Sequence, residues 1–361
     1  MNTYKQQAAS SEHHIGEGRK ISLFLFLLAA YCIFPTVSYS DEFRSRAAVV
    51  MDASTGRVLY AKNPDLKCPP ASTTKLMTAI VAIENANLAD IVTISNKAAH
   101  VSPHKAGFKR GDKVTVEKLL YAALLGSAND AAVALSEAVA GSEARFVELM
   151  NRKAVEIGAR DTKFINSNGL PGPGQYITAY DLSKIMSFAL RYPILKQIIG
   201  TRVTGISTEN GNAIFLKNTN RLLWSDEDLV GGKTGYTRKA RHCFVCAAER
   251  NKGTVIIALL GSPSRENLWK ETEELIGKGF EIIASKEGPI IYFTKADYDS
   301  INLKKASYKK NSRLKIKNSK LIKTKTKFAK KKGKMKTLAK GKDKKGKNYR
   351  IAEKSEDRNK G

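Results

Sequence analysis

The stretch Pro69–Ala79, PPASTTKLMTA, places two prolines and a serine directly before an apolar, alanine-rich run. Proline is tolerated at a helix start, and the run predicts a helix over Thr73–Ala86 with Ser72 at its beginning. Positions three apart share a helix face, so the Lys75 ammonium can reach the Ser72 hydroxyl. Since a serine attacks only after a base removes its proton, this spacing suits a nucleophile and its base. A helix cap with a solvated lysine is the alternative, and Ser102–Lys105 repeats the spacing in a loop.

Two further motifs favour the catalytic interpretation of Ser72 and Lys75 over a chance match. Ser127-Ala128-Asn129 lies between two helical patterns, where a short loop can present both polar side chains to a cleft. Lys233-Thr234-Gly235 opens a strand pattern, and Gly235 would let a ligand backbone lie close against that strand. The motifs Ser-x-x-Lys, Ser-x-Asn and Lys-Thr-Gly follow in this order at intervals of about 55 and 105 residues, which predicts one shared site.

Hydrophobic periodicity in the rest of the chain predicts a hairpin, a block of helices, and then strands with a final helix. The expected elements are a hairpin over Ala47–Asn63, helices over Val116–Leu125, Ala128–Val139, Phe146–Ile157 and Ala179–Arg191, strands over Lys233–Tyr236, Cys243–Glu249 and Thr254–Leu260, and a helix over Arg265–Ile283. This order predicts an α+β fold in which the first and last strands pair in one antiparallel sheet with helices packed on it.

From Ala48 to Trp269 the sequence resembles the low-molecular-weight penicillin-binding proteins, specifically the serine D-Ala-D-Ala carboxypeptidases of peptidase family S11. The likeness includes MDASTGRVLYAKN, PPASTTKLMTA, LLGSANDAAVALSEAVAGS, FVELMNRKA, DTKFINSNGL, ITAYDLS and GGKTGYT. It implies a β-lactamase/transpeptidase-like fold, with an antiparallel five-stranded sheet and helices on both sides. It also implies removal of the terminal D-alanine from peptidoglycan stem peptides, and acylation by penicillins.

The resemblance also implies a role for each motif residue. Ser72 would be the acyl-enzyme nucleophile, with Lys75 as its general base. Ser127 would relay a proton to the departing D-alanine, and Asn129 would hydrogen-bond the substrate peptide. The remaining expected contacts are the terminal carboxylate on Lys233 and Thr234, the close approach at Gly235, and an oxyanion hole made by the N–H groups of Ser72 and Tyr236. Lys233 would also lower the pKa of Lys75. Arg265 would add to carboxylate recognition, with a surface charge at a helix start as the alternative.

The sequence departs from the family pattern at two positions where the family usually has glycine, and in the number of domains that it predicts. Ala128 and Arg241 stand where the family usually has glycine, and Arg241 puts the shape of that edge in doubt. Many relatives carry a second, β-rich domain and a C-terminal amphipathic membrane helix. Only Gly288–Phe293 can begin such a domain here, so membrane attachment by that route is not expected.

Both ends of the chain differ in composition from the middle. Residues 1–40 predict a signal peptide, with Arg19 and Lys20 before the apolar run Ile21–Val37 and small residues before Asp41. Residues 41–287 are the expected serine D,D-peptidase domain, and 288–303 are the expected linker. Residues 304–361 are a lysine-rich tail; the last 61 residues hold 25 Lys and Arg against 4 Asp and Glu, which predicts disorder.

The predicted location is outside the cytoplasm, in the periplasm or cell envelope, with membrane association through an uncleaved leader as the alternative. There the tail is expected to bind anionic surfaces such as lipid headgroups. A solvated tail without a partner is one alternative. Another is a polycationic protein that binds nucleic acid through the tail, but export and sparse tail aromatics argue against specific nucleic-acid binding.

Two other activities fit the same fold. D,D-endopeptidase activity on cross-links is closely related to the carboxypeptidase reaction. A β-lactamase would need efficient water attack, which in class A enzymes depends on a glutamate between the second and third motifs. The corresponding segment, Asp161–Asp181, has no glutamate, so β-lactams are expected to act as inhibitors.

Cysteine and histidine spacing predicts no metal site and no cofactor. Cys243 and Cys246 resemble a redox or metal pair, but they lie in a strand pattern where positions three apart face opposite sides. With Cys68 they make an odd number after removal of the signal peptide, which argues against a complete disulfide framework.

Overall fold

A computed structural model describes residues 43–251 and 253–294 of the chain. The expected signal peptide, the lysine-rich tail and most of the linker lie outside these residues. Their interpretation as an export signal and a surface tether therefore stays a prediction. Within the described part, no helix is both long and apolar enough to cross a bilayer.

The centre of the fold is a mixed sheet of six strands in the order β10-β2-β1-β9-β8-β7. The strands are β1 Ala47–Asp52, β2 Val58–Lys62, β7 Leu229–Thr237, β8 Arg241–Arg250, β9 Gly253–Ser262 and β10 Ile290–Tyr292. The hairpin β1–β2 pairs with the last long strand, β9, as the element order predicts. Five of these strands form antiparallel pairs, whereas β10 runs parallel to β2.

The expectation of a five-stranded, fully antiparallel sheet was therefore wrong at one edge. Ile290–Tyr292 had been assigned to a linker or to the start of a second domain, but its backbone pairs with Tyr60–Lys62. An unpaired sheet edge presents a row of free N–H and C=O groups, and a short apolar segment arriving beside it can satisfy them. The segment turns back to this edge after α9, where Lys286 adopts a left-handed backbone conformation.

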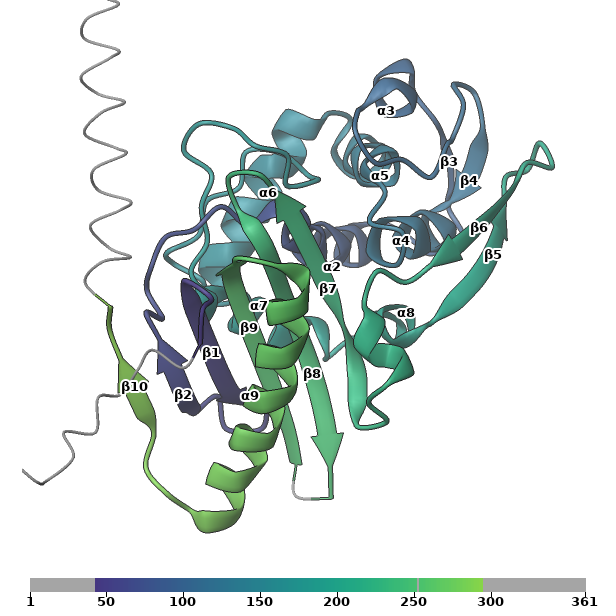
Figure 1. The fold of residues 1–361 in the computed structure, drawn as a ribbon. Coiled ribbons are helices and arrows are strands. Elements are labelled where there is room, and N and C mark those ends of the chain that lie inside the picture. The colour runs from purple at the N-terminus through teal and green to yellow at the C-terminus, as the bar shows by residue number, and fades with distance from the viewer. Residues whose placement is uncertain (1–42, 252, 295–361) are drawn as a thin grey trace, which may run out of the picture. The chain divides into compact units, whose positions relative to one another are not determined.

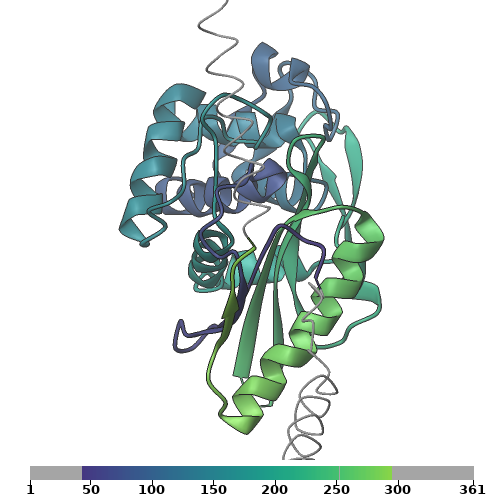
Figure 2. The same cartoon turned by 60° about the vertical axis from the view of Figure 1, so that its left-hand side comes forward.

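Helices cover both faces of the sheet. α9 packs on one face, while α7 and the other helices lie on the opposite side (Figures 1 and 2). The helices are α2 Lys75–Asn85, α3 Asn96–His100, α4 Val116–Leu124, α5 Asn129–Ala140, α6 Glu143–Glu156, α7 Ala179–Ala189, α8 Pro193–Gly200 and α9 Arg265–Ser285. Because β8 and β9 are covered from both sides, their sequences are continuous apolar runs rather than alternating ones.

Shorter elements complete the helical part. These are the 3-10 helices η1 Ala71–Thr74 and η2 Arg221–Trp224, the pair β3 Ile91–Thr93 with β4 Lys113–Thr115, and the hairpin β5 Val203–Ser207 with β6 Ala213–Lys217. Helix boundaries follow local signals: Ser142, Thr178 and Ser264 cap helix starts with their side chains, and Gly141 ends α5 at φ 71°.

Glu271 ties the first described residues to α9. Its carboxylate is 4% exposed and accepts hydrogen bonds from the Arg44 N–H at 2.5 Å, the Ser45 N–H at 3.2 Å and the Ser45 hydroxyl. A buried carboxylate is stable only when its acceptor sites are used. These three bonds therefore hold the beginning of the domain against its last helix.

Replacing Glu271 by alanine should lower the free energy of unfolding by about 2–3 kcal/mol, because three buried donors lose their acceptor. Urea denaturation of the full chain measures the change. Glu273→Ala, an exposed position on the same helix, is the matched control and should stay within about 0.5 kcal/mol of the wild type. Equal stabilities of the two variants would contradict this account of Glu271.

Candidate active site

Ser72 lies in the single 3-10 turn η1, directly before α2, and its side chain is half-buried. The predicted helix therefore begins at Lys75, two residues later than expected, and the serine is in a tight turn rather than in the helix. Ala71 precedes it at φ 50°, a left-handed conformation that is uncommon for a residue with a side chain. The turn brings the Lys75 Nζ to 3.0 Å from the Ser72 Oγ, as the spacing of the motif predicts.

The Lys75 ammonium is fully buried and has two further acceptors. Its Nζ donates to the Asn129 Oδ1 at 2.7 Å and to the Asn168 carbonyl at 2.7 Å. Burial lowers the pKa of Lys75 well below its ordinary value, the positive charge of Lys233 lowers it further, and Asp130 opposes the shift. A lysine with a lowered pKa can be neutral near pH 7 and can then accept a proton from a hydroxyl.

A second serine–lysine pair lies beside the first. Ser127, in the loop between α4 and α5, accepts a hydrogen bond from the Lys233 Nζ at 2.9 Å. Lys233 also donates to the Thr234 carbonyl at 3.0 Å, and burial lowers its pKa to about 7. Ser127 is 4% exposed and adopts φ 57°, so its position depends on a strained turn.

Gly235 brings these pairs together. A Cβ at this position would lie 2.9 Å from the Ser72 N and 3.1 Å from the Ala71 Cβ. Real Cβ atoms do not approach a backbone nitrogen so closely. The glycine is therefore needed so that η1 can pack directly against β7. The expected close approach of a ligand backbone at Gly235 stays a prediction.

Thr234 and Tyr236 extend along β7 on either side of Gly235. The Thr234 hydroxyl is hydrogen-bonded to the Thr219 hydroxyl at 2.6 Å, and the Tyr236 side chain is 56% exposed. The Tyr236 ring stacks on His242 with a centroid distance of 4.5 Å. Burial lowers the pKa of His242, and the charge of Arg265 lowers it further, which places the exposed Arg265 guanidinium near this edge.

A segment before α4, Pro103–Arg110, borders the Ser-x-Asn loop, and we call it the rim segment. The Asn129 N–H donates to the His104 carbonyl at 2.9 Å, and the Asn129 side-chain amide donates to the Pro103 carbonyl. Asp130, which is fully buried, accepts from the N–H groups of Ala106, Gly107 and Phe108 at 3.0, 3.0 and 3.3 Å. The rim segment is thus fixed to the start of α5.

The structure therefore gathers seven predicted residues in one network: Ser72, Lys75, Ser127, Asn129, Lys233, Thr234 and Gly235. Tyr236 and Arg265 lie at its edge. Sequence reasoning missed Asp130, Thr219 and the Asn168 carbonyl. Asp130 had a usable signal, because an acidic residue follows the Ser-x-Asn motif directly in the first turn of a helix.

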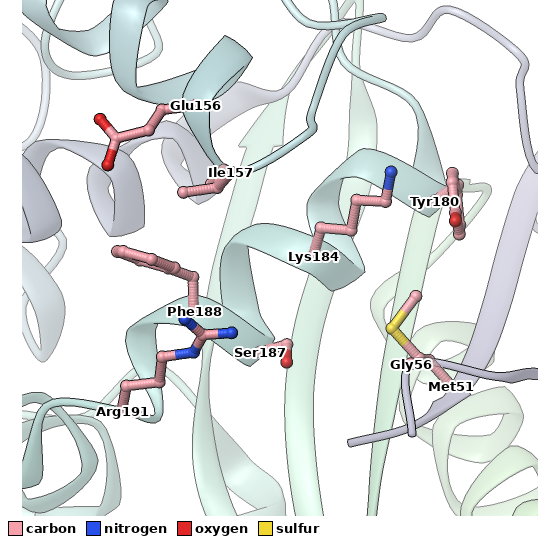
Figure 3. A pocket seen from close by; sticks show the side chains of 9 residues that line it. All are labelled: Met51, Gly56, Glu156, Ile157, Tyr180, Lys184, Ser187, Phe188 and Arg191. Atoms are coloured by element: carbon pink, nitrogen blue, oxygen red, sulfur yellow. The ribbon is translucent and has the colours of Figure 1, made fainter. Parts of the chain in front are cut away.

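A separate cavity of about 520 Å³ contains none of these residues. It lies between the end of α6, one face of α7 and the β1–β2 turn, and its wall includes Tyr180, Lys184 and Arg191 (Figure 3). Within residues 43–251 and 253–294, no three His, Cys, Asp or Glu side chains are grouped closely enough to hold a metal ion. Cys243 and Cys246 are buried thiols that form no disulfide in the described part of the chain, and Cys68 is also buried.

Two adjacent serine–lysine pairs, with the backbone N–H of Ser72 beside them, form the arrangement that a serine acyl-transfer site requires. The family model of peptidase S11, D-alanyl-D-alanine carboxypeptidase, matches residues 35–264. The chain belongs to this family.

Individual relatives agree with the assignment. The chain is 34% identical over 223 residues to D-alanyl-D-alanine carboxypeptidase DacF of Bacillus subtilis, which covers 60% of this chain and 57% of DacF. It is 31% identical over 252 residues to a D-alanyl-D-alanine endopeptidase of Pseudomonas aeruginosa, which covers 66% of this chain and 80% of the relative. The chain thus spans little more than half the length of DacF.

Solved structures show the same fold. The Streptomyces K15 DD-transpeptidase superposes with a TM-score of 0.63 at 32% identity, covering 66% of this chain and 98% of that structure. The α+β transpeptidase fold predicted from the sequence is therefore confirmed. The predicted sheet needs only the correction at β10.

Gly235→Ala should slow acylation by a labelled penicillin by at least about 100-fold, because the new Cβ would displace the Ser72 turn from β7. Gly205→Ala is the matched control, since a Cβ on that strand glycine meets no atom within 4 Å. Stopped-flow or gel-based labelling measures the rate, and circular dichroism verifies the fold of both variants. A Gly235→Ala protein that labels at the wild-type rate would show that the close approach is unnecessary.

Proposed function

We propose that the protein is a serine-type D-Ala-D-Ala carboxypeptidase that removes the terminal D-alanine from peptidoglycan stem peptides through an acyl-enzyme on Ser72. The observation that carries the proposal is the pairing of Ser72 with Lys75 at 3.0 Å beside Ser127 with Lys233 at 2.9 Å. One pair supplies a nucleophile and a base, and the other supplies a proton path and a cation. Membership of family S11 supports the same reaction.

In the first half of the reaction, neutral Lys75 takes the proton of the Ser72 hydroxyl as the oxygen attacks the carbonyl carbon between the two D-alanines. The N–H groups of Ser72 and Tyr236 stabilise the negative charge that develops on the carbonyl oxygen. The C–N bond then breaks. The proton that Lys75 took from Ser72 passes through Ser127, which is hydrogen-bonded to Lys233, to the leaving amine of D-alanine, so Lys75 is neutral again before the second half.

In the second half, a water molecule attacks the Ser72 ester. Lys75 accepts a proton from this water, Ser72 recovers its hydroxyl proton, and the shortened peptide leaves with a free carboxylate. Because Lys75 is the base in both halves, its lowered pKa favours both the formation and the hydrolysis of the acyl-enzyme.

Substrate binding divides between the two walls of the crevice. Thr234 and charged Lys233 on β7 bind the terminal carboxylate, with Arg265 adding positive charge from the Tyr236 edge. Asn129 on the opposite wall contacts the acyl part of the peptide. Its side-chain oxygen already accepts from Lys75 at 2.7 Å, so substrate and base share this amide.

D,D-endopeptidase activity is the second candidate, because a relative at 31% identity carries that name. It uses the same acyl-enzyme with a larger leaving group. A β-lactamase is disfavoured, since the segment Asp161–Asp181 offers Lys75 the Asn168 carbonyl and contains no glutamate. A β-lactam should therefore acylate Ser72 and act as an inhibitor. The stem-peptide substrate requires action at the cell envelope, as the expected signal peptide also suggests.

Ser72→Ala should abolish covalent labelling by penicillin and lower D-alanine release from a pentapeptide by at least about 10³-fold, because the ester forms on the Ser72 oxygen. Ser102→Ala removes the serine of the other Ser-x-x-Lys sequence in the domain and serves as the control that keeps both activities. Labelling followed by mass spectrometry, together with a D-alanine assay, measures the two effects. Label retained by the Ser72 variant would rule out the proposed nucleophile.

The proposed roles of the two lysines predict that kcat/KM follows a bell-shaped pH profile. The acylation rate should rise with pH as Lys75 loses its proton, and should level off well below the ordinary lysine pKa. The KM for a peptide ending in D-Ala-D-Ala should rise above about pH 7, where Lys233 loses the charge that binds the carboxylate. Lys233→Arg keeps its charge at these pH values, so its KM should stay flat. A wild-type KM that is constant to pH 9 would contradict the role of Lys233.

A further inference from the structure

The rim segment is fixed to the catalytic wall that carries Ser127 and Asn129. The His104 carbonyl accepts from the Asn129 N–H, and the buried Asp130 carboxylate accepts from three successive N–H groups of the segment. His104 itself is held at φ 69°, a conformation that a residue with a side chain adopts only when its surroundings impose it. Its position beside Asn129 is therefore well defined.

The charges around this position are almost all positive. Lys105, Lys109 and Arg110 in the rim segment are exposed, and the segment contains no Asp or Glu. The cations inside the crevice are Lys75 and Lys233, and the one carboxylate beside them, Asp130, is buried and bonded to backbone N–H groups. A binding wall of this kind favours an anionic group on its ligand.

The His104 imidazole shares the electrostatic environment of the two catalytic lysines. Its side chain is exposed to solvent, and its backbone adjoins Asn129. Partial burial lowers its pKa, the charges of Lys233 and Lys75 lower it further, and Asp130 opposes the shift. The free protein thus holds a largely neutral imidazole near pH 7, next to positive charges that an incoming carboxylate would offset.

We propose that His104 is a specificity-determining residue that binds a carboxylate on the acyl part of the substrate, on the N-terminal side of the scissile bond. The proposal rests on the proposed carboxypeptidase function. β7 is assigned to the terminal carboxylate, so the opposite wall, with Asn129 and His104, faces the preceding residues. The protein should therefore prefer peptides with an acidic residue before D-Ala-D-Ala over the corresponding amides.

The pH dependence of this preference has a definite sign. A bound carboxylate favours the imidazolium, so the pKa of His104 rises in the complex and binding takes up a proton. The KM for an acidic peptide should then fall as the pH decreases toward 6. The KM for the amide peptide should lack this component, because an amide does not stabilise the imidazolium.

The test uses two N-acetylated peptides that end in D-Ala-D-Ala and differ only in the preceding residue, glutamate in one and glutamine in the other. Assayed with the full chain at pH 6, the glutamate peptide should have a KM about 10-fold lower, with similar kcat. His104→Gln should bring the ratio of the two KM values close to one. His100→Gln is the matched control, because that exposed imidazole is bonded to the Asn96 carbonyl at 2.8 Å on α3 and should leave the preference intact.

A preference that persists in His104→Gln, or is absent from the wild type, would overturn the proposal. A second measurement separates this result from a failure of the proposed function. Calorimetric titration of each peptide into Ser72→Ala, in two buffers of different ionisation enthalpy, should show more proton uptake with the glutamate peptide than with the glutamine peptide, and this difference should disappear in Ser72→Ala/His104→Gln. If the wild type releases no D-alanine and takes no penicillin label, the carboxypeptidase assignment fails, while the titration still decides whether His104 binds the carboxylate.

Discussion

The whole site depends on two ammonium groups that are buried in one crevice. Taking an ammonium ion out of water costs several kcal/mol, so Lys75 and Lys233 both shift toward their neutral forms. Three acceptors around the Lys75 Nζ limit this cost and fix its direction toward Ser72. A solvated lysine stays charged at neutral pH, so the unfavourable burial is what the proposed role of Lys75 as a base requires.

Burying both groups requires three distant segments to meet without gaps. η1 approaches β7 so closely that only glycine fits at position 235, and Gly169 packs against the Ala71 carbonyl in the same way. The backbones of Ala71, His104 and Ser127 all adopt left-handed conformations. Such residues cost about 1–3 kcal/mol each and persist only where the surrounding packing determines them. The sheet and its two helical layers supply that packing.

Much of this site was predictable because its chemistry resides in side chains with fixed spacing. The i, i+3 relation gave the Ser72–Lys75 contact, and the order of the three motifs indicated a shared crevice. Parts of the site made from the backbone have no such signature. The Asn168 carbonyl could belong to any residue type, and the Thr219–Thr234 contact joins segments whose relation depends on the tertiary fold. The strand β10 was missed because three residues are too few to show a period.

The two sides of the site, β7 and the Ser-x-Asn loop with its rim segment, are stabilised in different ways. Residues proposed for catalysis and residues proposed for selectivity therefore depend on different contacts. β7 is part of a sheet hydrogen-bonded to β8 along nearly its full length, so the groups on it are fixed by the core. The opposite side is a loop, and the rim segment beside it is held by its backbone N–H groups on Asp130 and by the buried Phe108 side chain. Backbone bonds place few demands on side-chain identity. The bonds that hold the rim segment do not use the His104 side chain, so the proposed selectivity at this position can change while the backbone contacts with Asn129 and Asp130 are kept.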